Sequence, residues 1–295
     1  MSPARPVLAE LAGLLACPEC GLALEPRDRT SGSKAAPPPG RIEALRCGQG
    51  HSFDLAKQGY VSLLTGASTK MTGDTAAMLD ARAAFQGGGH FAAIADAVAG
   101  AASAPATEPA AVVLEIGAGT GYYLARTLDT APEARGLALD VAKAAVRRSA
   151  RAHPRAAAVL ADAWRGLPLR DESVHRVLSV FAPRNPAEVA RVLRADGRFV
   201  VATPTPRHLA ELVGPLGLVT VDPDKDRRLS ESMAGHFELL DRVVVDYPMK
   251  LDRADIANVV GMGPSAFHDE GRDHSALPAS LEVTASVTVS SYGHA

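Results

Sequence analysis

A chain of 295 residues is long enough for one main domain and a small appended module. Hydrophobic residues make up 47% of the chain and charged residues 22%, which excludes a disordered or fibrous protein. The formal net charge of -2 excludes a strongly basic protein, so total charge gives no indication of a nucleic-acid partner.

The N-terminal segment has a short apolar run that leads directly into a cysteine pair, without the small-residue cleavage site of a signal peptide. The longest apolar stretch, from Ala92 to Ala106, is rich in alanine and is interrupted by Asp96, Gly100 and Pro105. It falls short of the roughly 20 strongly apolar residues that a membrane span requires. We therefore expect a cytoplasmic protein with no membrane partner.

The cysteines and one histidine form a metal-binding pattern, in which two residues separate Cys17 from Cys20 and three separate Cys47 from His51. Thiolates at this spacing lie on one tight turn, and two such turns complete a tetrahedral site with no position left for a substrate. An odd number of cysteines in a cytoplasmic chain also disfavours disulfides. The pattern predicts a structural Zn2+ site. The alternative is a set of unlinked buried thiols beside a surface histidine.

These ligands belong to a predicted zinc-binding module over residues 1–65, in which residues 28–41 form a polar, proline-rich insertion expected to be extended or disordered. So small a module buries little surface, so metal binding should supply much of its folding free energy. Residues 66–108 are predicted as a second segment, with a mobile linker over 65–75 followed by a helix from Ala76 to Phe85.

Strand and helix patterns alternate from Val112 onward, which predicts a parallel sheet with helices on both faces. The first strand leads into Glu115-x-Gly117-x-Gly119-x-Gly121 and then into a helical pattern, so the backbone of this turn can approach a ligand closely. A dinucleotide fingerprint would need glycine at position 122, where this chain has tyrosine. The spacing instead resembles motif I of class I methyltransferases, which favours S-adenosylmethionine over NAD.

Acidic residues end the next two predicted strands. Asp140 lies 19 residues after Gly121, a distance that accommodates one helix and one strand, and its carboxylate suits a ribose diol. Its alternative role is to cap the following helix. Asp162 ends the third strand, where class I methyltransferases commonly place a group near the adenine amine; the alternative is a solvated turn. Trp164, the only tryptophan, either stacks on a base or packs internally.

The fourth predicted strand, over residues 174–183, ends at Phe181-Ala182-Pro183. Amino-group methyltransferases often carry Asn/Asp-Pro-Pro-aromatic there, so this departure disfavours an exocyclic amine as the acceptor. A helix over 186–196, a strand over 197–204, a helix over 207–217 and a terminal pair of strands complete the pattern. The predicted fold is α/β: a class I methyltransferase domain over residues 109–295, with a Rossmann-like, seven-stranded, mostly parallel sheet.

Several segments together resemble the ribosomal RNA guanine-N1 methyltransferase family. They are Cys17 to Leu64, Ala81 to Ala97, the EIGAGTGYY turn and the ATPTPRHLAEL segment. The resemblance extends over nearly the whole chain and includes the order of its modules. Within the family, the chain is most similar to members that protect producers of tylosin-type macrolides.

The resemblance implies methyl transfer to N1 of a guanine in a domain II hairpin loop of 23S rRNA, where macrolides bind, and a homodimer as the assembly. It also implies that Gly117, Ala118 and Gly119 contact the cofactor and that Phe91 and His208 face it. Phe91 stands where relatives commonly have tyrosine, so a hydroxyl contact is missing here. Glu115, Gly121, Asp140 and Asp162 complete the predicted cofactor set, and Cys17, Cys20, Cys47 and His51 the zinc set.

Catalysis at guanine N1 requires that the proton on this nitrogen be removed or the resulting negative charge be stabilised. Arg184, Arg207 and His208 are the candidates for this role. N1 also lies on the Watson–Crick edge, so the target base must be unpaired or flipped outward. The zinc-binding module is the expected clamp for the RNA backbone.

Two other functions fit parts of the same sequence. A small-molecule methyltransferase could use the same cofactor domain, since fold alone does not choose an acceptor. A zinc-dependent RNA-binding protein with a vestigial cofactor site is the second alternative, which the intact glycine motif and Asp140 disfavour.

Overall fold

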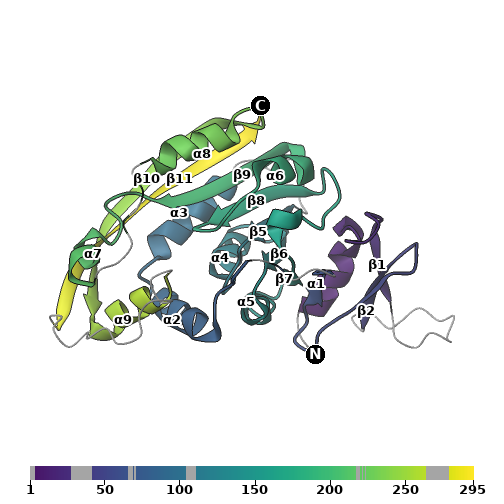
Figure 1. Cartoon of the computed structure of the whole chain (residues 1–295), viewed down its shortest axis with the longest axis horizontal. Helices are drawn as coiled ribbons and strands as arrows, with labels where there is room; N and C mark the ends of the chain where they lie inside the picture. Colours follow the sequence, from purple (N-terminus) through teal and green to yellow (C-terminus); the bar gives the residue numbers. More distant parts are fainter. Residues whose placement is uncertain are drawn as a thin grey trace.

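The computed structural model describes residues 4–27, 42–65, 69, 71–103, 111–216, 220, 222, 224–263 and 279–295. The insertion expected at residues 28–41 and part of the predicted linker lie outside these ranges. The described residues form an eight-stranded sheet and a small three-stranded sheet, with helices around the larger one (Figure 1). No helix in the described ranges is long and apolar enough to cross a membrane.

The main sheet has the strand order β10-β11-β9-β8-β5-β6-β7-β4. Neighbouring strands are parallel from β9 to β4, whereas β11 is antiparallel to both β9 and β10. Its strands are β4 Val61–Ser62, β5 Val112–Ile116, β6 Arg135–Asp140, β7 Ala156–Leu160, β8 Val174–Val180, β9 Leu193–Pro204, β10 Phe237–Asp252 and β11 Ser280–His294.

The observed main sheet therefore has eight strands, one more than the seven that were predicted. The additional strand, β4, comes from the end of the predicted zinc-binding module and pairs in parallel with β7, Val61 beside Val159 and Ser62 beside Leu160. The sequence over residues 51–64 indicates a short strand, but so short a segment does not show which sheet it joins. Their pairing extends the sheet at an edge that β7 would otherwise leave open.

Helices cover both faces of the main sheet, as the alternating pattern predicted. One core cluster joins a sheet face to α3 Ala92–Ala102, α4 Tyr122–Thr130, α5 Lys143–Ser149, α7 Ala210–Leu216 and α9 Arg253–Gly261. The other joins the opposite face to α1 Ala4–Leu11, α6 Pro186–Val192 and α8 Lys225–Met233. Within β5, Val113 belongs to the first cluster and Val112 and Leu114 to the second, so this strand is apolar on both sides.

Two predicted helices have different bounds in the structure. The helix expected over 186–196 ends at Val192, because Leu193 is extended and buried and begins β9 by pairing with Val174. The helix expected over 207–217 begins only at Ala210. A turn precedes it, closed by the His208 N–H donating to the Thr205 carbonyl, so His208 lies in this turn rather than on the helix.

The zinc-binding module shares its hydrophobic core with the main sheet. Its antiparallel strands are β1 Leu24–Arg27, β2 Ala44–Cys47 and β3 Ser52–Asp54. Leu24 and Leu45 are fully buried in the cluster that also contains Leu114 and Val159 of the main sheet. Helix α1 lies between the small sheet and β7 (Figure 1). Packing is therefore continuous from the module into the large domain.

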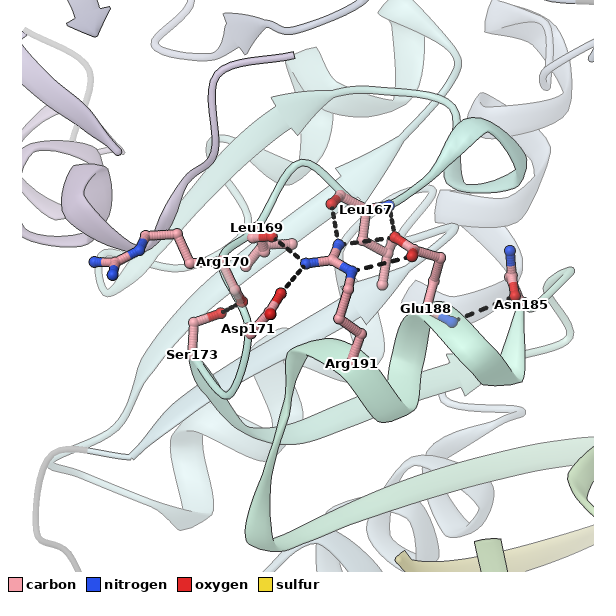
Figure 2. Close-up of polar contacts among 8 residues, drawn as sticks. All are labelled: Leu167, Leu169, Arg170, Asp171, Ser173, Asn185, Glu188 and Arg191. Atoms are coloured by element: carbon pink, nitrogen blue, oxygen red, sulfur yellow. Dashed lines mark hydrogen bonds and ion pairs between the residues drawn. The ribbon is translucent and has the colours of Figure 1, made fainter. Parts of the chain in front are cut away.

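The loop over residues 166–171 pairs with the zinc-binding module and is held in place by hydrogen bonds from Arg191 of α6 (Figure 2). The Arg191 guanidinium donates to both carboxylate oxygens of Glu188, to Asp171 and to the carbonyls of Leu167 and Leu169, at 2.8–3.0 Å. All five of its N–H groups are thereby used. The loop in turn pairs with residues 14–16 through two backbone hydrogen bonds and one β-bridge.

Candidate functional site

The four predicted zinc ligands lie together on two turns. The Cys17 and Cys47 Sγ atoms lie 3.6 and 3.4 Å from His51 Nδ1, and the Sγ atoms of Cys20 and Cys47 are 3.6 Å apart. All four ligand atoms lie within 4.8 Å of one another. Gly21 and Gly50 close the two turns with positive φ values of 73° and 91°, which glycine adopts without steric cost.

These separations suit a tetrahedral Zn2+ ion. Ligands at about 2.0–2.3 Å from zinc stand roughly 3.3–3.8 Å from one another, and the set leaves no open position. Hydrogen bonds from Cys20 and from the backbone of His51 and Gln49 outweigh burial and lower the pKa of Cys47 to about 6. A thiolate, the form that binds metal, is thus favoured before any ion binds.

A second candidate site is a cavity of about 510 Å3 at the carboxyl ends of the parallel strands. Gly117 and Ala118 of the glycine turn lie in its wall. Gly119 and Gly121 are not among the described residues that line it, and Gly121 is closely packed: a Cβ there would approach Ala152 Cβ to 2.7 Å and Ser149 Cα to 3.1 Å. The turn therefore exposes its first glycine to a ligand and uses its last to pack against the chain after α5.

Asp140 stands at the end of β6, within this cavity wall. Its two carboxylate oxygens accept the backbone N–H groups of Gly119 and Ala142 at 2.9 and 2.8 Å. The helix cap itself is Ala142, so Asp140 is not the N-cap residue considered as its alternative role. Each oxygen keeps a lone pair, and the side chain ties the glycine turn to β6 while facing the cavity.

Glu115 is fully buried beneath the glycine turn and also contributes to the cavity wall. One carboxyl oxygen accepts the Leu124 N–H at 3.1 Å. Burial raises the pKa of Glu115 to about 8, against the effect of that hydrogen bond. Burial therefore favours the neutral acid, whereas a cationic ligand nearby would favour the charged carboxylate.

Asp162 lies just beyond β7 and joins three segments. Its carboxylate accepts the Thr69 hydroxyl at 2.5 Å and the Trp164 N–H at 3.0 Å. Met71, Thr72, Gly73 and Asp74, predicted as part of a mobile linker, line the same cavity. Trp164 is 52% exposed and lines it too, so packing in the core is not its role in this structure.

His208, Phe91 and Phe181 form an aromatic group in the cavity wall. Ring centroids of His208 lie 5.8 Å from those of both phenylalanines, and the His208 and Phe181 rings are nearly parallel at 20°. The Ser286 N–H donates to His208 Nδ1 at 3.2 Å. Burial, reinforced by the charge of Lys225, lowers the pKa of His208 to about 4. Neutral His208 thus carries its proton on Nε2 and acts there as a donor.

The two predicted catalytic arginines are placed differently. Arg207 is exposed and forms an ion pair with Asp246 at 3.1 Å, and Arg184 donates to the Ala182 carbonyl at 3.2 Å. Neither is among the described residues that line the cavity. The Arg184 side chain is partly buried, and this burial lowers the pKa of its guanidinium.

Three residues that sequence reasoning missed line the cavity: Arg82, Tyr123 and Lys225. Arg82 of α2 Ala76–Gly87 ion-pairs with Asp74 and donates to the Met262 carbonyl at 2.8 Å. The Tyr123 hydroxyl is buried without a hydrogen-bond partner in the described structure. Arg82 and Lys225 come from helices outside the recognised strand-to-turn pattern. The EIGAGTGYY segment does contain Tyr123, but gives no sign that its hydroxyl faces a ligand.

The cavity fits S-adenosylmethionine on two observations. A Cβ at Gly117 would meet Ala182 Cβ at 2.7 Å, so the turn keeps open a narrow cradle that only glycine leaves free. The unpartnered Tyr123 hydroxyl offers a hydrogen bond to a ligand in the same wall. Asp140 and Asp162 would hold the nucleoside end, and Glu115 with Gly117 the methionine end.

Comparison with known proteins agrees with both sites. A model described as "Methyltransferase domain" matches residues 113–197, and one described as "RlmA, N-terminal", a zinc ribbon, matches residues 40–68. The chain is 46% identical to a "23S rRNA (guanine(748)-N(1))-methyltransferase" of Streptomyces fradiae, over 93% of this chain and 94% of that protein.

A relative from Micromonospora griseorubida, provisionally named as a 23S rRNA (guanine-N(1)-)-methyltransferase, is also 46% identical, over 94% of this chain and 96% of its own. Among solved structures, a methyltransferase from Thiobacillus denitrificans in complex with S-adenosylhomocysteine is 14% identical, with a TM-score of 0.45, covering 68% of this chain and 90% of that one.

Proposed function

This chain belongs to the family of 23S rRNA (guanine-N1)-methyltransferases, and we propose that it methylates N1 of the guanine that corresponds to guanine 748 in the name of the Streptomyces fradiae relative. The observation that carries the proposal is one cavity in which a glycine turn and two carboxylates for S-adenosylmethionine continue into an aromatic wall suited to a base. The zinc ribbon beside it supplies a second surface for RNA.

The chemistry asks the protein mainly for alignment. When bound, S-adenosylmethionine supplies an activated methyl group on a sulfonium centre. Gly117 and Asp140 position this donor, and Phe181 and Phe91 exclude water from the acceptor side of the cavity. His208 donates from Nε2 and cannot at the same time accept the guanine N1 proton there. We propose that it holds the base or the cofactor rather than removing the proton.

The RNA must present N1 outside a base pair, because this atom lies on the Watson–Crick edge. We propose a hairpin loop as its source. A second cavity, of about 560 Å3, lies between the Cys17 turn and the 166–171 loop, and Arg165 and Arg170 line it. Asp162 belongs to the walls of both cavities. This continuity supports a path for the RNA backbone from the zinc-binding module to the methyl donor.

We propose roles for the remaining parts on the same basis. Residues 1–65 recognise RNA, residues 66–108 cover the cofactor, and residues 109–295 transfer the methyl group. Arg207, which is exposed, and Arg184, which is near the acceptor end, contribute positive charge toward the RNA rather than direct contacts in the cavity. We also propose action in the cytoplasm, as a homodimer, with resistance to tylosin-type macrolides as the consequence.

Primer extension on 23S rRNA tests the reaction and its position together. N1-methylguanine blocks Watson–Crick pairing, so reverse transcription should stop beside one domain II guanine after incubation with the protein and S-adenosylmethionine. The Asp140→Ala variant serves as the control, because it should lose cofactor binding and give no stop. Absence of a stop on both naked RNA and ribosomal subunits, with S-adenosylmethionine still bound, would instead favour a small-molecule acceptor.

A further inference from the structure

The cofactor cavity has an acceptor end that differs in composition from its cofactor end. The cofactor end holds the carboxyl groups of the wall, which lie over β5, β6 and β7 or beside Arg82. They are Asp74, Glu115, Asp140 and Asp162. Phe181 follows β8, and Pro204 ends β9. His208 and Lys225 complete this second half of the wall. The acceptor end is therefore aromatic and cationic, without a described carboxylate.

Phe181 has the features of a platform for a planar ring. It is 41% exposed although it lies in the cavity wall, and its φ of 53° is unusual for a residue with a side chain. Such conformations persist where the surrounding structure maintains them, and they are concentrated at binding sites. A guanine on the face of Phe181 would bring its Watson–Crick edge toward the other residues of the acceptor end.

Lys225 is the cation at this end, and its ammonium has no partner among the described residues. It is the first residue of α8 and is half-buried, and no hydrogen bond or ion pair joins its Nζ to another described residue. Burial and then the nearby charge of Arg184 lower the pKa of Lys225, whereas Asp226 opposes them. The charge of Lys225 also contributes to the lowered pKa of His208, so the two side chains lie in the same part of the cavity.

The proposed reaction creates a negative charge that needs such a group. Loss of the N1 proton leaves a guanine anion whose charge is shared with O6, the neighbouring atom on the same edge. The described residues at the acceptor end offer donors for O6: the Lys225 ammonium and the His208 Nε2–H. A fixed donor at a site of developing charge is worth about 100–1,000-fold in rate.

We propose that Lys225 is a catalytic residue whose ammonium contacts guanine O6 and stabilises the N1-deprotonated base, with His208 as the second donor. The inference rests on the proposed function and adds the group that acts on the acceptor. In this step the N1 proton passes to water and N1 forms a bond to the methyl carbon. The carbon–sulfur bond breaks with its electron pair remaining on sulfur, which leaves S-adenosylhomocysteine.

The test compares full-length Lys225→Met, Lys225→Arg and Arg227→Met proteins. Arg227 is two residues further along α8 and exposed, where it pairs with Asp224 and Glu231, so its loss controls for removal of a cation from this helix. We expect Lys225→Met to lower the single-turnover methylation rate about 100-fold. Its dissociation constant for S-adenosylmethionine should stay within about twofold of wild type, since Lys225 lies away from the cofactor end.

The pH dependence separates a stabilising cation from a proton acceptor. Without the cation, the rate of Lys225→Met should rise with pH as guanine itself ionises, so that its deficit shrinks in alkaline buffer. Lys225→Arg keeps the charge and should remain within about tenfold of wild type. If Lys225→Arg is as slow as Lys225→Met at every pH, Lys225 is a base and the proposal is wrong.

The inference can fail independently of the proposed function. Wild-type protein that gives no stop in primer extension contradicts the function itself. Wild-type protein that gives the stop, together with Lys225→Met reacting at an unchanged rate, contradicts only the role of Lys225. Thermal unfolding of each variant, and its cofactor affinity, show whether a slow rate reflects loss of the fold.

Discussion

The zinc end and the cofactor end of the molecule hold their ligands in opposite ways. At the zinc end, four side chains from two short turns converge, and the three-stranded sheet around them is small. At the cofactor end, the eight-stranded sheet with helices on both faces places strand ends and backbone around a cavity. A metal ion can thus organise a region with little core, whereas a large organic ligand needs a core to position its site beforehand.

The comparison has a limit, since the two ends share one hydrophobic cluster. Helix α1 and the buried leucines of the small sheet pack against one face of the main sheet, and α1 contacts β7 there. Loss of structure at the zinc end should therefore also destabilise the cofactor end. The following changes, in order of expected effect, test how far each end depends on the other.

The largest effect should come from Cys47→Ser, which removes a zinc ligand. Binding of structural zinc contributes on the order of 10 kcal/mol to small zinc-binding folds, so the module should unfold and expose part of the shared core. We expect loss of bound zinc by elemental analysis and a lower unfolding temperature for the whole chain. Ser52→Ala, beside the ligand His51 on exposed β3, is the control. An unchanged unfolding temperature in Cys47→Ser would mean that the two ends are independent.

Glu115→Gln should change how the cofactor end responds to pH. The pKa of Glu115 is about 8 in the folded protein and 4.5 as its ordinary value, so the folded state binds more protons between these limits. Stability of the ligand-free wild type should fall as pH rises through this window. Each pKa unit corresponds to about 1.4 kcal/mol, so the glutamine variant should be more stable by several kcal/mol at pH 9 and similar at pH 5. Urea unfolding at both values measures this difference, and parallel curves for the two proteins would contradict it.

Gly121→Ala tests whether the glycine turn depends on packing. Gly121 has a φ of 80°, and an added Cβ would overlap Ala152 and Ser149, so we expect a loss of about 2–4 kcal/mol. Gly100→Ala in α3 is the control, because a Cβ there meets nothing within 4 Å. Urea unfolding compares the two. Equal stability would show that the turn relaxes without cost.

The smallest effect should come from Arg191→Lys at the junction of the two ends. Lysine cannot reproduce the planar set of five donors seen in Figure 2, so the 166–171 loop should lose about 1–3 kcal/mol of support. We expect faster hydrogen exchange at residues 166–171 and at their partners 14–16, with cofactor affinity unchanged. Arg147→Lys, at an exposed position on α5, provides the comparison. Unaltered hydrogen exchange in Arg191→Lys would mean that the Arg191 hydrogen bonds do not contribute to docking of the module.

Prediction from sequence succeeded where the information is local. The spacing of Cys17, Cys20, Cys47 and His51 determines two turns, and the ligand atoms do converge. The glycine turn and the alternation of strands and helices also predicted the class I fold, which the match to a methyltransferase domain confirms.

Prediction failed where a residue's role depends on distant partners. The helix expected to continue to residue 196 ends at Val192 because Leu193 pairs with Val174, a contact that no local propensity contains. The pairing of β4 with β7 likewise depends on an open sheet edge far away in the sequence, which the local pattern does not show. Arg207 was a candidate from sequence and Lys225 was not, yet Lys225 lines the cavity and Arg207 does not.

The sequence by itself therefore determined the cluster of three cysteines and one histidine, the glycine turn and the order of strands and helices, because short-range spacing and hydrophobic periodicity encode them. The tertiary structure alone decided which side chains meet across the cavity and how the small module joins the large sheet. Both depend on contacts between segments far apart in the chain, such as Thr69 with Asp162 and Ser286 with His208. Their geometry follows from packing of the whole core, which no single segment specifies.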